Sequence, residues 1–460
     1  MDFDELERLR RRRQPGLAEA RLPSLGRLKG EDTELASPGP LTGDPVVSLA
    51  FDLAACLLLI VLFVAPFLSG GHLPLVWGAV AILVGGTLAA CQTLIALRDP
   101  SRPSTLARFG APLWLALVLP AYAVVQMLPL GLGGGSLTIS ISADATALGL
   151  VRLASVIFVF VLAASIAASR RRATRFGWAL FAVAVGHAIF ALAKGGPDGA
   201  RGGFANHNSF AAFVGMGLIL GVALVFGNPR RGLAEGGKGV WLAERLLLGL
   251  ALLVLAVALL SSGSRLGAFS AVCGGLVVVA LRGFGSGWTV LAVSGGALVA
   301  VFLGGAGLTE RALLLGPASQ TRAELFLQVT ELIRARPLMG WGLDSFPLAF
   351  EQAHRPPVSS GLVWDQAHNS YLSLWAEMGL IAGSAPIAAL LWCAVRLLRG
   401  IRSARGDKAF GIAALGILAT EAVHALGDFS LEIAGNLYFF VTVLALGLSA
   451  QTSGKPLEGR

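Results

Sequence analysis

Long apolar blocks separated by short polar segments occupy the chain from residue 48 to residue 450. Many blocks run for roughly 18 residues or more, which is enough for an α-helix to cross a bilayer. Strands of an outer-membrane barrel would instead alternate apolar and polar positions over about 10 residues. The pattern therefore predicts an all-α polytopic membrane protein with about 12 transmembrane helices.

The predicted organisation has five parts. They are a basic, flexible cytoplasmic tail (1–47), nine transmembrane helices (48–304), one large loop (305–370), three further transmembrane helices (371–450) and a second cytoplasmic tail (451–460). The individual spans are expected at 48–69, 73–97, 111–128, 148–168, 176–193, 208–227, 246–263, 266–281, 288–304, 371–395, 409–427 and 431–450.

Composition agrees with a membrane protein. Hydrophobic residues make up 55% of the chain and charged residues 14%, whereas soluble proteins have about 25% charged residues. These values exclude a soluble enzyme, a disordered protein and a coiled coil. The four cysteines (Cys56, Cys91, Cys273 and Cys393) lie in four different apolar blocks without a CxxC pair, so we expect buried structural thiols.

The net charge of +9 is explained by topology without a nucleic-acid partner. With the N-terminus in the cytoplasm, 27 of the 36 Lys and Arg residues fall on the cytoplasmic side and 8 outside, and Arg152 lies within a span. This asymmetry follows the positive-inside rule and predicts that both termini are cytoplasmic. The large loop then faces outside, as expected for a functional segment of this length.

The large loop contains a helix signal of its own. Thr321 and Glu324 have capping-box spacing, and Pro337 ends the helical run. Apolar residues repeat at helical spacing between them, at Leu325, Phe326, Val329, Leu332 and Ile333. We therefore expect an amphipathic helix on the rim of the membrane domain that packs on protein.

Three outside arginines oppose the positive-inside trend: Arg201, Arg265 and Arg322. An arginine in a bilayer costs about 2.5–3.5 kcal/mol on insertion scales, so such residues are usually paired or functional. A planar guanidinium suits phosphate oxygens. The three residues together predict an outer site for a pyrophosphate, although each alone also fits an interface anchor or an ion pair.

Other ionisable residues lie at or within the late spans. His368 precedes a span at the water boundary, where an imidazole serves as a general base or as a structural group, and Glu377 follows inside that span. Glu421, His424 and Asp428 have i, i+3, i+7 spacing, which predicts one helical face. That face fits the lining of a substrate cavity, a proton relay or, more weakly, a divalent-cation site.

These motifs resemble those of the O-antigen ligase and polymerase family. The family's His-Asn, nine residues, Gly pattern matches His368, Asn369 and Gly379, with Ala382 in place of the final Gly, Thr or Tyr. Its Arg-x-Gly-x-Phe-x-Asn-x-Asn segment resembles Arg201 to Asn208, through Gly203, Phe204 and Asn206. Its Ser-Arg pair resembles Ser264-Arg265, and its loop motif resembles Arg322 followed by Pro337, Gly340 and Gly342. The region of His424, Asp428 and Asn436 is similar to the tail of part of the family.

The resemblance implies a GT-C-like, inverting glycosyltransferase that needs no metal or other cofactor. Its donor would be a glycan on undecaprenyl pyrophosphate at the periplasmic face of the bacterial inner membrane. Its acceptor would be lipid A–core for a ligase, in lipopolysaccharide biosynthesis, or another lipid-linked glycan for an O-antigen or exopolysaccharide polymerase. His368 would be the catalytic base, and Arg201, Arg265 and Arg322 would bind the pyrophosphate. Supporting roles would fall to Asn206, Asn208, Ser264, Gly340, Gly342, Asn369, Glu377 and Asp428.

Two other classes remain open from the sequence. About 12 spans with intramembrane acidic residues and a histidine also suit a proton-coupled transporter or a flippase for lipid-linked oligosaccharides. Against this, the two halves of the chain show no internal repeat, which many transporters have. A structural scaffold gives no reason for the outer Arg–His constellation. Walker A, HExxH and GxSxG motifs are absent from the chain.

Overall fold

A computed structural model describes residues 44–98, 111–131, 137–196, 199–225, 231–282, 317–358, 363–403 and 408–452. Over these residues the chain is helical and contains no strand, which confirms the all-α prediction. The α-helices are α2 (Pro45–Val64), α3 (Pro74–Arg98), α4 (Ala111–Met127), α5 (Ala143–Ile166), α6 (Arg170–Lys194), α7 (His207–Val225), α8 (Arg231–Ser261), α9 (Arg265–Arg282), α12 (Pro317–Ala335), α13 (Phe346–Ala353), α14 (Ser370–Ser403), α15 (Ala409–His424) and α16 (Ala434–Thr452). Short 3-10 turns occur at η1 (Ala65–Phe67), η2 (Ser69–Gly71) and η4 (Ser430–Glu432).

Eight of these helices are long and apolar enough to cross a membrane, and three shorter apolar helices lie at 114–127, 409–424 and 434–450. Together they coincide with eleven of the predicted spans. The predicted span at 288–304 lies outside the described residues, as do most of the two predicted tails. The main difference is at α8, which begins at residue 231, well before the predicted start at 246.

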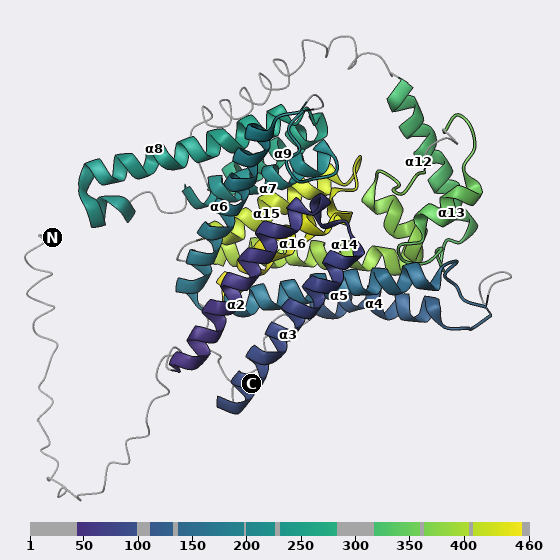
Figure 1. Ribbon diagram of the computed structural model, residues 1–460, viewed down its shortest axis with the longest axis horizontal. Coiled ribbons are helices and arrows are strands. Elements are labelled where there is room, and N and C mark those ends of the chain that lie inside the picture. Colours follow the sequence, from purple (N-terminus) through teal and green to yellow (C-terminus); the bar gives the residue numbers. More distant parts are fainter. Residues whose placement is uncertain are drawn as a thin grey trace, which may run out of the picture. The chain divides into compact units, whose positions relative to one another are not determined.

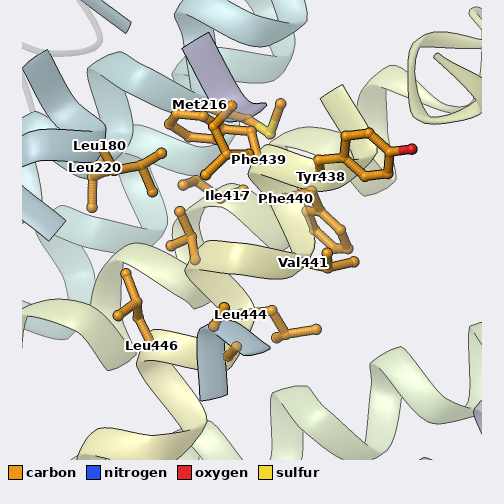
Figure 2. Packing of buried hydrophobic residues seen from close by; sticks show 14 of the residues in the cluster. Leu180, Met216, Leu220, Ile417, Tyr438, Phe439, Phe440, Val441, Leu444 and Leu446 are labelled. Atoms are coloured by element: carbon orange, nitrogen blue, oxygen red, sulfur yellow. The ribbon is translucent and has the colours of Figure 1, made fainter. Parts of the chain in front are cut away.

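The core of the membrane domain forms around α7, which contacts α6, α8, α9, α15 and α16 (Figure 1). In the most apolar 18-residue stretch of α7, 83% is buried inside the protein. The same share is 17% in the most apolar stretch of α8. Figure 2 shows Leu180, Met216, Leu220, Ile417 and Phe439 packed where α6, α7, α15 and α16 meet. Glycines on α7 let α6 approach closely, because a Cβ at these positions would meet side chains of α6, and such close packing favours a central place in the bundle.

Contacts between segments that are distant in the sequence occur at both ends of the described helices. At one end, the segments that were predicted to be outside contact one another, for example through Ile141 N donating to Trp341 O at 3.0 Å. At the other end, Arg172 Nε donates to Asp52 Oδ1 at 2.8 Å. Arg201 and His368 lie in the segments before α7 and α14, and Arg265 is the first residue of α9.

The thiol prediction is confirmed for two of the four cysteines. Cys91 and Cys393 are buried and Cys273 is half-buried, but Cys56 is exposed on α2, so the prediction is wrong there. Leu53 on the same helix is also exposed, at 61%. An apolar helix surface exposed in this way has lipid as its solvent, which removes the cost of leaving Cys56 outside the protein core.

The amphipathic helix predicted in the large loop is α12, and it packs on protein as expected. Its apolar positions Leu325, Val329, Leu332 and Ile333 are buried against α13 and the start of α14. Figure 1 shows α12 and α13 beside one another at one end of α14. The capping-box prediction is wrong, because α12 begins at Pro317 and Thr321 therefore lies inside the helix.

The segment that follows α12 docks into a break in α14 at Gly379. Gly379 has φ +72° and ψ 167°, a conformation that only glycine adopts readily. This break leaves backbone groups of α14 available for tertiary bonds. Leu380 N donates to Pro337 O at 2.8 Å, and Trp341 N donates to Ala376 O at 2.9 Å. The two glycine motifs of the sequence therefore meet as one backbone joint between the loop and the membrane domain.

We expect the Gly379→Ala variant to have a lower Tm. A Cβ at this position would contact the carbonyl of Leu338, and the positive φ alone costs about 1–3 kcal/mol for a non-glycine residue. Gly86→Ala in α3 is the matched control, because a Cβ there has nothing within 4 Å. Thermal unfolding of both purified variants in detergent measures the difference. Equal Tm values for the two variants would contradict the proposed joint.

Candidate functional site

A pocket of about 280 Å³ lies where α7, α9, α12 and the turn after α15 meet. Arg265 is the first residue of α9, and Arg322 lies in the second turn of α12. Both arginines line this pocket, so two of the three predicted pyrophosphate-binding residues share one cavity. The full lining is His207, Asn208, Gly263, Ser264, Arg265, Leu266, Arg322 and Gly427.

The third arginine, Arg201, is exposed and lies outside this lining. Its segment is held against the turn that begins α9, because Ala200 N donates to Ser261 O at 2.8 Å. On its other side, Lys194 Nζ donates to Gly202 O at 3.3 Å. Arg201 is therefore anchored beside the wall of the pocket that Gly263 and Arg265 form.

Two helix N-termini reach the pocket, and each is capped by a predicted site residue. Asn206 Oδ1 accepts a hydrogen bond from Ser209 N at 2.7 Å at the start of α7. Ser264 Oγ accepts one from Gly267 N at 3.1 Å at the start of α9. Such caps fix where each helix begins. The uncapped first-turn N–H groups and the helix dipoles then give the pocket a positive character beyond its arginines.

His368 lies immediately before α14 in the left-handed region, with φ +52°. Its ring packs edge-on against Phe429, with centroids 5.0 Å apart, and lies 6.2 Å from the ring of Trp364. The following residue, Asn369, fixes this corner because its Oδ1 accepts from Tyr371 N at 3.0 Å. Asn369 Nδ2 also donates to the carbonyl oxygen of Leu426 at 2.9 Å.

Burial lowers the pKa of His368 below its ordinary value of 6.5, and this effect is larger than those of the neighbouring charges. Among those charges, Asp428 raises the pKa of the imidazole and Arg322 lowers it. The imidazole is therefore neutral at neutral pH, which is the state that a general base requires. Arg322, which lines the pocket, is therefore close enough to His368 to affect the pKa of its imidazole.

Asp428 is fully buried and connects the start of α7 to the region of His368. Its carboxylate accepts hydrogen bonds from Asn208 Nδ2 at 2.9 Å and from Ser430 Oγ at 2.6 Å. Its position corrects the prediction of one polar helical face. Helix α15 ends at His424, and Asp428 lies in the following turn, where it faces α7.

The other two members of the predicted face, Glu421 and His424, are buried in α15. Their side-chain oxygen and nitrogen atoms make no hydrogen bond with the described residues. Within the described part of the chain, no three His, Cys, Asp or Glu side chains gather as a set that could hold a metal ion.

Gly340, Gly342 and Glu377 lie at the joint on α14 and do not line the pocket. Gly342 N donates to Glu377 O at 2.9 Å, and Glu377 Oε1 accepts from Phe346 N at 3.2 Å. A Cβ on Gly340, at φ +67°, would contact the same carbonyl of Glu377. These contacts hold the loop on α14, and the predicted supporting role of the three residues stays a prediction.

Sequence reasoning gave no role to several residues that lie near the pocket or near the joint between the loop and α14. Arg152, within α5, pairs with the carboxylate of Asp344, and its Nη1 donates to Glu432 O at 3.3 Å. An arginine in an apolar span was the available signal, but its partners are distant in the sequence. His207 and Ser430 were also missed, because no motif distinguishes them from ordinary polar residues near a helix end.

The fold and the pocket define a class of protein. It is a polytopic helical membrane protein with a cationic cavity at one end of its helices and with His368 near that cavity. Residues 250–387 match the family model for O-antigen ligase. This match confirms the family resemblance, and the matched segment contains Arg265, Arg322, His368 and Gly379. It supports glycan transfer of the O-antigen ligase or polymerase type as the general activity, in a multi-pass bacterial membrane protein. No curated protein matches the chain.

Proposed function

We propose that the protein is an inverting glycosyltransferase of the periplasmic face of the inner membrane, and that it needs no metal ion. It transfers a glycan from undecaprenyl pyrophosphate to a sugar hydroxyl of lipid A–core or of another lipid-linked glycan. The observation that carries the proposal is that Arg265 and Arg322 line one pocket, with His368 within electrostatic reach of Arg322. This arrangement suits an anionic leaving group beside a base.

In the proposed reaction, the acceptor hydroxyl oxygen attacks the anomeric carbon while His368 takes up the hydroxyl proton. A glycosidic bond forms, and the bond from the anomeric carbon to the phosphate oxygen breaks. The electron pair of the broken bond stays on the departing pyrophosphate. The nearby negative charge of Asp428 stabilises the imidazolium that forms, because the two groups attract each other.

Arg265 and Arg322 stabilise the charge that gathers on the pyrophosphate, as fixed cations do when they are aimed at a developing anion. Arg201, from its position beside the pocket, contacts the same pyrophosphate at its edge. Asn206, Asn208 and Ser264 hold the two helix starts that form the wall. The site lies at the end of the helices that the positive-inside rule assigns to the periplasm.

The test is a transfer assay with the purified protein in lipid vesicles. We expect glycan transfer from the lipid-linked donor to continue after treatment with EDTA. Loss of transfer that a divalent cation restores would contradict metal independence. Movement of the lipid-linked glycan across the bilayer without any transfer would favour the flippase alternative.

The pH dependence of transfer tests the role of His368 separately. The rate should rise with pH through the lowered pKa of His368, because only the neutral imidazole accepts a proton. Asp428→Asn removes the larger of the two negative charges that raise this pKa, the other being Asp365, so the acidic limb of the profile should move to lower pH. Asparagine keeps a polar group next to Asn208 and Ser430. A shift to higher pH, or no shift, would contradict the electrostatic link.

A further inference from the structure

His207 is a pocket residue that neither the motifs nor the proposed reaction use. It is the first residue of α7 and lines the pocket together with Arg265 and Arg322. The side chains of its neighbours are engaged, since Asn206 caps α7 and Asn208 donates to Asp428. Among the described residues, no hydrogen-bond partner of the half-buried His207 side chain is found. A polar side chain at the wall of a cationic pocket is therefore available to a ligand.

The charge of the pocket fits the released lipid better than the donor. Arg265 and Arg322 supply two full positive charges, and the N-termini of α7 and α9 add about half a charge each. The pyrophosphate of the donor is esterified at both ends and carries about one negative charge on each phosphate. Once the sugar leaves, the terminal phosphate becomes a monoester, which carries roughly 1.5–2 negative charges near pH 7. The additional charge appears at the atom that the sugar has left.

We propose that His207 donates a hydrogen bond to the terminal phosphate of the departing lipid pyrophosphate. It thereby recognises the released lipid, whose terminal phosphate is a monoester, in preference to the glycosylated donor, whose pyrophosphate is esterified at both ends. No proton is transferred in this step, since a neutral imidazole already carries one N–H donor. The inference rests on the proposed function, because it takes the lipid pyrophosphate as the occupant of the pocket.

The test measures lipid binding directly, with full-length protein in nanodiscs and without an acceptor. The probes are undecaprenyl pyrophosphate and the same lipid with its terminal phosphate capped as a methyl ester. We expect His207→Ala to weaken binding of undecaprenyl pyrophosphate about tenfold, as loss of a hydrogen bond to a charged group does, and to change binding of the methyl ester much less. His207→Asn keeps an N–H donor and should recover part of the affinity.

His354→Ala is the matched control. This histidine follows α13, outside the pocket, where its Nδ1 lies 3.2 Å from Glu351 O. It should bind both lipids as the unaltered protein does, and the Tm of each lipid-free variant shows that it is folded. Equal loss of both lipids in His207→Ala, or no loss of either, would overturn the role of His207 while leaving the proposed function intact. Failure of the unaltered protein to bind the pyrophosphate would overturn the proposed function itself.

Discussion

The His368→Ala variant should transfer glycan about 10²–10⁴-fold more slowly than the unaltered protein, which is the usual contribution of a general base. The imidazole is half-buried beside Phe429, and burial keeps it neutral at neutral pH. Without it, the acceptor hydroxyl loses the neutral imidazole that takes its proton in the proposed reaction. The measurement is the initial rate of transfer in vesicles, at saturating concentrations of donor and acceptor.

Two controls distinguish loss of the catalytic base from disruption of the turn that carries it. The variant should keep its Tm, because Asn369 and not His368 makes the hydrogen bonds that hold this turn. It should also bind undecaprenyl pyrophosphate as before, since His368 does not line the pocket. An unchanged transfer rate in a folded variant would rule out His368 as the base.

The Arg265→Ala and Arg322→Ala variants should each lower the transfer rate about 10²-fold, at the lower end of the effect of removing one donor from an anion-stabilising site. The lower end applies because both arginines are exposed, so that water screens their charge. Lysine at either position keeps the charge but loses the planar fork, so it should restore only part of the rate.

Arg334→Ala is the matched control for Arg322. Arg334 is an exposed arginine on the same helix, α12, but it does not line the pocket. Its loss removes one positive charge from the loop and should change the transfer rate by less than about twofold, because solvent screens such exposed charges. Equal effects of the two substitutions would mean that the general charge of the loop matters and that the pocket does not.

Much of the fold was predictable because membrane spans follow from local composition. Eleven predicted spans coincide with apolar helices, and the apolar face of α12 was identified from its helical spacing. The end of α15 was predicted too late, at 427. The apolar run does continue to Leu426, but the backbone turns after His424, where the carbonyls of Ala425 and Leu426 accept bonds from the start of α14. Such tertiary bonds have no signal in a single sequence.

The candidate site was predictable only in part, for the same reason. The outside arginines stood out because they oppose the charge asymmetry, and two of them share the pocket. The spacing of Gly340 and Gly379 was recognised as a motif, but its physical cause is contact between two backbones that are distant in the sequence. The pairing of Arg152 with Asp344 likewise depends on the folded structure.

The central claim is a single displacement at the anomeric carbon, with His368 as the base and the pyrophosphate bound by Arg265 and Arg322. The stereochemistry of transfer tests this claim most directly. The purified protein is given a lipid-linked glycan of known anomeric configuration, and NMR reads the configuration of the new glycosidic bond. We predict the opposite configuration in the product, with one undecaprenyl pyrophosphate released for each glycan transferred. Retention of the donor's configuration would contradict direct attack by a hydroxyl that His368 activates.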